Sequence, residues 1–71
     1  MVNTAKIKGR MAELQIRQAD LAKEMGISAS TVCQKINNDR PMTLDEAERM
    51  STLLGIVDAE FGAFFFAKQI A

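Results

Sequence analysis

The chain has 71 residues, and its nine Lys or Arg residues balance its nine Asp or Glu residues. This length indicates one domain with a small core and a stability within roughly 5 kcal/mol. One Cys and no His exclude an intramolecular disulfide and a His-based metal or catalytic site, and the absence of an apolar run of about 18 residues excludes a membrane span.

The first helix is predicted from about Thr4 to Leu14, because apolar residues recur there at helical spacing in Ile7, Met11 and Leu14. Either Asn3 or Thr4 can cap its start. Lys6 and Arg10 lie four residues apart and so share the outer face of this helix. They are candidates for contact with phosphate, and an ordinary solvated face explains them equally well.

Residues 18–37 are predicted to form two short helices joined by a tight turn. The first of the two has an apolar face made of Leu21, Ala22 and Met25. Gly26 can adopt the positive φ that ends a helix, and Ile27 fills the corner with an apolar side chain. Ser28 can cap the second helix by accepting a hydrogen bond from a free backbone N–H.

The second helix of this pair is predicted to face inward with Val32 and Ile36. Its outer face has no acidic residue and carries Ala29, Ser30, Thr31, Gln34 and Lys35. Small side chains at its start allow another surface to approach closely, and Gln and Lys can bond base edges or phosphates. An ordinary helical hairpin within a core is the alternative interpretation. Cys33 lies on this helix without a candidate base, and we interpret it as a packing residue.

The loop after this helix, residues 37–41, combines turn-forming residues with one exposed cation. Asn38 and Asp39 tolerate left-handed backbone, and Pro41 prevents the helix from continuing. Arg40 is the candidate phosphate contact of the loop, whereas Asp39 would oppose such a contact.

A fourth helix has the clearest start signal, because Thr43 and Glu46 have the spacing of a capping box. Met42 can pack onto Ala47, and Gly55 ends the helix. The core positions of this helix are predicted to be Leu44, Ala47, Met50, Ser51 and Leu54. The acidic residues Asp45, Glu46 and Glu48 lie near its positive end, which explains them without a metal site.

A Phe-rich segment begins at about residue 58. Ile56 and Val57 are predicted to return to the core, and Asp58 to cap a short helix from about Ala59 to Phe65. Phe61, with Phe64 or Phe65, is predicted to be core. Three consecutive Phe residues cannot all face inward on one helix, so an exposed apolar patch is expected as a partner or dimer contact, with the candidates Phe65, Phe66 and Ile70. Whether the tail is helical or extended stays open.

Charge is unevenly distributed along the chain. Residues 1–40 hold seven basic and four acidic residues, a net charge of +3, and residues 41–71 hold two basic and five acidic residues, a net charge of −3. Such polarity suits a protein that turns one face to phosphate and another away from it. A chance division of charge is the alternative.

These motifs resemble the helix-turn-helix of the Cro and phage-repressor family, through Gln18, Ala22, Gly26, Ile27 and Val32. The resemblance extends over nearly the whole chain, and the terminal Phe residues 64–66 are similar to those of modulator-of-repression proteins of temperate phages. It implies a compact, all-α, five-helix domain spanning residues 1–71, in the cytoplasm of a bacterial host. Because the chain has no His, Tyr or Trp, we expect no enzyme, and no cofactor, metal or small-molecule substrate either.

The resemblance also implies a transcription regulator of the lysis–lysogeny switch, which binds operator DNA, a partner repressor, or both. The implied base contacts are Ser28, Ser30, Thr31, Gln34 and Lys35. The implied phosphate contacts are Arg10, Arg17, Gln18 and Arg40, where Arg17 replaces a capping Thr common in relatives. A homodimer on a palindromic site is the usual geometry. The alternative is an anti-repressor or co-repressor that acts chiefly by protein contact, which the zero net charge and surplus Phe favour.

Overall fold

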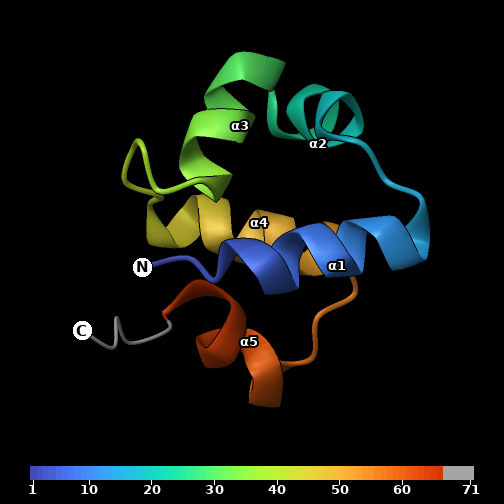
Figure 1. The fold of residues 1–71 in the computed structure, drawn as a ribbon, viewed down its shortest axis with the longest axis vertical. Helices are drawn as coiled ribbons and strands as arrows, with labels where there is room; N and C mark the ends of the chain where they lie inside the picture. The colour runs from blue at the N-terminus through green and yellow to red at the C-terminus, as the bar shows by residue number, and fades with distance from the viewer. Residues whose placement is uncertain (67–71) are drawn as a thin grey trace.

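The computed structural model describes residues 1–66, in which five helices follow one another through short connections (Figure 1). The helices are α1 (Thr4–Leu14), α2 (Gln18–Met25), α3 (Ala29–Ile36), α4 (Leu44–Leu53) and α5 (Asp58–Phe65). Within this part of the chain, no helix is both long and apolar enough to cross a membrane. The predicted all-α, five-helix fold is therefore confirmed.

Local sequence signals define most of the helix ends. Asn3 caps α1 by accepting from the backbone N–H of Lys6, and Ser28 caps α3 by accepting from that of Thr31. At α4 the capping box is complete, because the Thr43 hydroxyl accepts from the Glu46 N–H and the Glu46 carboxylate accepts from the Thr43 N–H. These three predicted caps are confirmed.

Glycine ends two of the helices. Gly26 follows α2 with φ +70°, and Gly55 follows the last turn of α4 with φ +63°. A residue with a Cβ is strained in this left-handed region, so both positions suit Gly. Gln15 and Asn38 also adopt positive φ, at +56° and +64°. Asn38 fits the predicted turn, whereas no signal marked Gln15.

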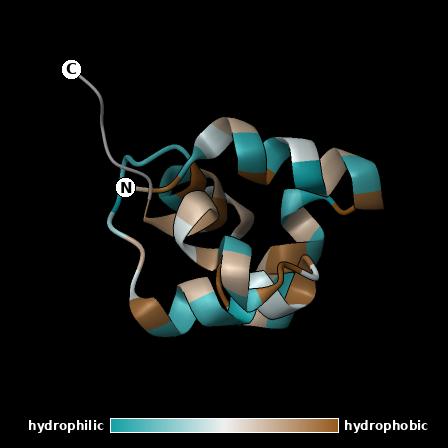
Figure 2. Ribbon diagram, turned by 90° about the horizontal axis from the view of Figure 1, so that it is seen from below, coloured by the Kyte–Doolittle hydropathy of each residue, from teal (hydrophilic) through white to brown (hydrophobic). Residues whose placement is uncertain are grey.

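The core lies between all five helices and the N-terminal residues. Its most completely buried side chains come from α1 to α4 and from the cap of α4, namely Ile7, Leu21, Val32, Ile36, Met50 and Leu54. Figure 2 shows hydrophilic and hydrophobic segments alternating along the helices, as expected of helices that bury one face each. The predicted inward face of α3 is confirmed by these burials.

Three residues predicted to be core are exposed instead. Leu14, Leu44 and Val57 are between 39% and 59% exposed. Leu14 and Leu44 occupy the last and first positions of their helices, and Val57 is the N-cap of α5. Helical periodicity places a residue on a face, but at a helix end no neighbouring helix covers that face. The predicted cap Asp58 is also wrong, because Asp58 is the first residue of α5 itself.

The aromatic residues of α5 divide into a buried set and one exposed side chain. Phe64 and Phe65 are buried, Phe61 is half-buried with its ring centroid 5.0 Å from that of Phe65, and Phe66 is 53% exposed. The prediction of a partly exposed aromatic segment is confirmed for Phe66. It is wrong for Phe65, which faces the core, and Ile70 lies outside the described residues.

Arg10 fixes α1 to the end of α4. Its Nε donates to the carbonyl of Leu54 over 2.8 Å, and its Nη2 donates to the carbonyl of Gly55 over 3.3 Å. These carbonyls belong to the helix end, where intrahelical donors are missing. Arg10 is therefore not on a free outer face, and its neighbour Lys6 lies over the Phe64 ring, 5.3 Å from the centroid.

We predict that Arg10→Ala lowers the free energy of unfolding by about 1–3 kcal/mol, because it leaves the Leu54 carbonyl at a helix end without its charged donor. Urea unfolding at neutral pH measures the change. Lys8→Ala is the matched control, since Lys8 is an exposed cation of the same helix, and should change stability by no more than about 0.5 kcal/mol. Equal effects of the two substitutions would contradict the structural role of Arg10.

Candidate nucleic-acid interface

The helix pair α2–α3 presents the first half of α3 to solvent. Helix α3 packs on α2 with its apolar side, so its opposite side points away from the core. Ser28, Ala29 and Ser30 are exposed, and Thr31 and Gln34 are half-buried. All five are small or uncharged, so the beginning of α3 can approach an anionic surface closely without repulsion.

The hydroxyl groups at the start of α3 are held in position by each other. The oxygens of Ser28 and Thr31 are 2.8 Å apart, and the Ser28 oxygen also accepts from the Thr31 N–H. This cap fixes the first turn of α3. Gln34 lies four residues after Ser30 and three after Thr31, so the three side chains share one side of the helix.

Lys35 lies apart from this outer set. Its Nζ donates to the Glu46 carboxylate over 2.8 Å and to the Pro41 carbonyl over 3.1 Å, and the Lys35 side chain is only 12% exposed. Burial by itself would raise the pKa of Glu46, but the hydrogen bonds from Lys35 and Thr43 outweigh burial and lower this pKa. Lys35 therefore ties α3 to α4, and its predicted place on the outer face of α3 is wrong, because the ion pair draws it toward α4. Its predicted contact with a base stays a prediction.

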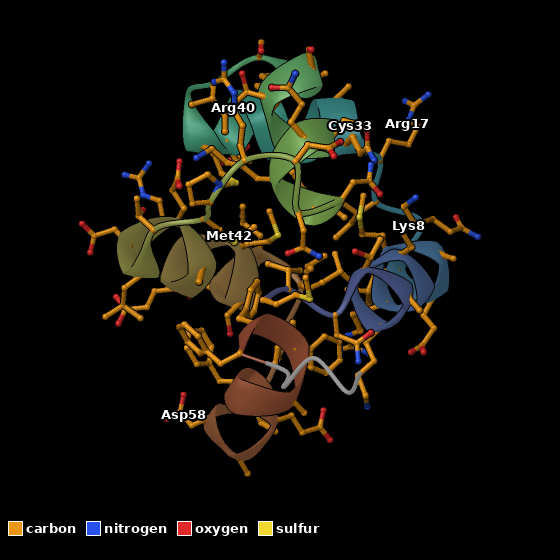
Figure 3. All side chains as sticks on the ribbon, turned by 60° about the vertical axis from the view of Figure 1, so that its left-hand side comes forward. Lys8, Arg17, Cys33, Arg40, Met42 and Asp58 are labelled. Atoms are coloured by element: carbon orange, nitrogen blue, oxygen red, sulfur yellow. The ribbon has the colours of Figure 1, made fainter. Side chains whose placement is uncertain are left out.

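Two of the predicted phosphate-binding cations lie near α3. Arg17 precedes α2 and its side chain is 86% exposed, and Arg40 is exposed in the loop after α3. In Figure 3 they lie on either side of α3. Gln18, half-buried, is the first residue of α2 and adjoins Arg17.

The remaining predicted cation, Arg10, is not part of this arrangement, because it binds the end of α4 on the side of α5. Lys8, which the sequence pattern did not select, points outward on the same side as Arg17 (Figure 3). Lys8 directly follows the buried Ile7, so the helical period of α1 turns it away from the core. This pattern could have identified it as an exposed cation from the sequence.

A metal ion and a reactive thiol each need particular neighbouring side chains. Among the described residues, no group of His, Cys, Asp or Glu has the proximity that a metal ion needs. Cys33 is half-buried, and its sulfur lies 3.3 Å from the amide nitrogen of Asn37. An amide is not a base, so this contact does not form a nucleophile–base pair.

Two of the grooves on the described surface, neither lined by a residue of α3, differ in chemical character. The first, of about 750 Å³, is lined by residues of α2 and α4 and is called here the acidic groove, because four of its eight lining residues are acidic (Glu24, Asp45, Glu46 and Glu48) and one, Arg49, is basic. The second, of about 390 Å³, is largely apolar and is called here the terminal groove; its lining comprises Met1, Val2, Asn38, Arg40, Pro41, Met42, Ala47, Phe65 and Phe66. The acidic groove gives the molecule a negative side to which α3 contributes no residue.

Comparison with known proteins agrees with this geometry. A family model described as a Cro/C1-type HTH DNA-binding domain matches residues 6–60. The matched segment begins in α1 and ends in α5, so it includes the whole α2–α3 pair and its turn. A comparison with curated proteins found no match.

The Lys35–Glu46 pair leads to a prediction about acid stability. Because the pKa of Glu46 is lower in the folded than in the unfolded chain, ionised Glu46 stabilises the fold above its ordinary pKa of 4.5, and this contribution is lost as pH falls through the lowered pKa. We expect Glu46→Gln to flatten the decrease in unfolding free energy below about pH 5. Urea unfolding at a series of pH values measures it.

Glu48→Gln is the control for this prediction, since Glu48 is an exposed glutamate of the same helix. It should leave the pH dependence close to that of the parent chain. A Glu46→Gln variant with the full acid dependence of the parent would show that the pair contributes no pH-dependent stability.

Proposed function

The chain belongs to the Cro/C1-type HTH DNA-binding domain family, and we propose that it regulates the lysis–lysogeny switch of a phage or prophage by binding operator DNA in the host cytoplasm. The observation that carries this proposal is the outward half of α3, which combines a fixed first turn, small side chains and no acidic residue. A helix of this kind fits the major groove, where its first residues meet base edges.

The proposed contacts follow from the positions of the side chains. Gln34 offers the paired donor and acceptor that match an adenine edge, and a hydroxyl or methyl of α3 can meet bases or a thymine methyl. The base-contacting set is Ser28, Ser30, Thr31 and Gln34. Arg17, Gln18 and Arg40 are proposed to contact phosphates on either side of the groove, together with the positive end of α2.

The net charge of zero supports DNA binding that depends on a specific fit between α3 and the operator. A neutral chain has little general attraction for DNA, since phosphate contacts by cations supply most non-specific affinity. Helix α3 has eight residues and reaches few base pairs. We therefore propose that two copies bind a palindromic operator, with one α3 in each half-site.

Substitutions at Gln34 and Arg40 separate base reading from phosphate contact. Gln34→Ala should lower the preference for the operator over random DNA by about tenfold, because one paired base contact contributes about 1–3 kcal/mol of discrimination. Arg40→Ala should weaken binding to both DNAs by a similar factor. Fluorescence anisotropy with a sequence selected from a random duplex library measures both.

Arg49→Ala is the matched control, because Arg49 is an exposed arginine of α4 that lines the acidic groove, to which α3 contributes no residue. It should leave both affinities unchanged. Equal losses on selected and random DNA for Gln34→Ala would contradict its role in reading bases, and absence of any selected sequence would contradict operator binding.

A second candidate function is contact with a partner repressor, as an anti-repressor or co-repressor. The observation that favours it is the exposed Phe66 at the edge of the terminal groove, beside the exposed Met1. Exposed apolar side chains around a groove are typical of protein-binding surfaces. Net neutrality also suits a protein whose main partner is another protein.

For this second function, Phe66→Ser should weaken binding to the purified repressor of the same phage or prophage at least tenfold, because aromatic side chains commonly dominate such interfaces. Isothermal titration calorimetry measures the affinity. Leu44→Ser is the control, since Leu44 is as exposed as Phe66 but does not line the terminal groove. Equal effects of the two variants, or no binding of repressor by the parent chain, would contradict the proposal.

A further inference from the structure

The residues before α1 are hydrogen-bonded to the loop that follows α3. The Val2 N–H donates to Oδ1 of Asn38 over 2.9 Å, and Nδ2 of Asn38 donates to the Val2 carbonyl, also over 2.9 Å. The side-chain amide of Asn38 thus pairs with both the N–H and the carbonyl of Val2. Val2 itself is buried, so this pair lies at the edge of the core.

Thr4 extends this network to the end of α3. Its hydroxyl donates to the Ile36 carbonyl over 2.6 Å, and Nδ2 of Asn38 lies 3.4 Å from the same hydroxyl. The Ile36 carbonyl is one of the last of α3 and has no donor within the helix. The N-terminal segment, residues 2–4, therefore supplies hydrogen-bond partners both to the last carbonyls of α3 and to the loop that follows.

Asn is suited to position 38 for two separate reasons. Its φ of +64° lies in the left-handed region, which Asn tolerates better than most residues. Its amide carries both a donor and an acceptor, as the Val2 backbone does. Gly would satisfy the first requirement and not the second, so the two roles can be separated by substitution.

The loop that Asn38 fixes contains the proposed phosphate contact. The backbone N–H groups of Asp39 and Arg40 both donate to the Gln34 carbonyl, over 2.8 and 3.2 Å. The path of the loop therefore determines where the Arg40 side chain lies relative to Gln34. Figure 1 shows the N-terminus beside this loop, below the end of α3.

We infer that Asn38 is a positioning residue, through which residues 2–4 fix the loop that carries Arg40 next to α3. The inference rests on the proposed DNA binding for its functional consequence and on hydrogen bonds alone for its structural part. The N-terminal segment is thereby assigned an indirect part in the proposed DNA binding, through its hydrogen bonds to Asn38 and to the end of α3.

Asn38→Gly tests this inference, because Gly keeps the left-handed backbone and removes both bonds to Val2. We expect faster hydrogen exchange at the Asp39 and Arg40 amides, with the amides of α2 unchanged. We also expect about 3- to 10-fold weaker binding to the selected operator. Asn37→Ala is the control, since Asn37 is the C-cap of α3 and its side-chain amide donates to the Cys33 carbonyl rather than to the N-terminal segment.

A double-mutant cycle shows whether Asn38 acts through Arg40. Arg40→Ala should weaken DNA binding less in the Asn38→Gly background than in the parent, because the arginine is already misplaced there. Fully additive losses, or unchanged exchange at Asp39 and Arg40, would overturn the inference. Faster exchange in Asn38→Gly with no DNA binding by any variant would overturn the proposed function and support the positioning of the loop.

Discussion

The structure depends on the burial of one narrow side of α3. Val32 and Ile36 are completely buried, and burial of such side chains contributes about 1.5–3 kcal/mol each. The Ser28 cap contributes about 1 kcal/mol. Packing therefore fixes the rotation of α3, and the cap determines only where the helix begins. Because the rotation is fixed by two residues one turn apart, the opposite side of an eight-residue helix is turned to solvent.

The sequence predicts the parts of the fold that depend on near neighbours. The capping box of Thr43 and Glu46 and the turn at Gly26 each arise within a few residues, so their patterns specify them. Burial at helix ends could not be predicted in this way. Leu44 has the correct period, but whether a neighbouring helix covers it depends on the lengths and angles of helices elsewhere in the chain.

In the candidate site, too, features that depend on near neighbours in sequence could be predicted, and features that depend on distant residues could not. The outward positions of Ser30, Thr31 and Gln34 follow from the helical period of α3, whereas the use of each cation does not. Arg10 binds carbonyls 44 and 45 residues away in sequence, and Lys35 pairs with Glu46 on another helix. A basic residue on a helix can bind phosphate or link helices, and its sequence neighbours do not distinguish the two uses. Two cations with structural roles leave fewer for DNA, which makes specific fit more important to the proposed binding.

The two proposed functions converge on the loop after α3. Asn38 and Arg40 line the terminal groove, and the same Arg40 is the proposed phosphate contact. A protein bound in that groove beside Phe66 would contact the loop whose path Asn38 determines. Binding there would then change the position or the accessibility of Arg40, and by linkage DNA binding would change the affinity for the partner by the same factor. If the chain binds both DNA and a repressor as proposed, the two binding events would therefore be coupled through this one loop.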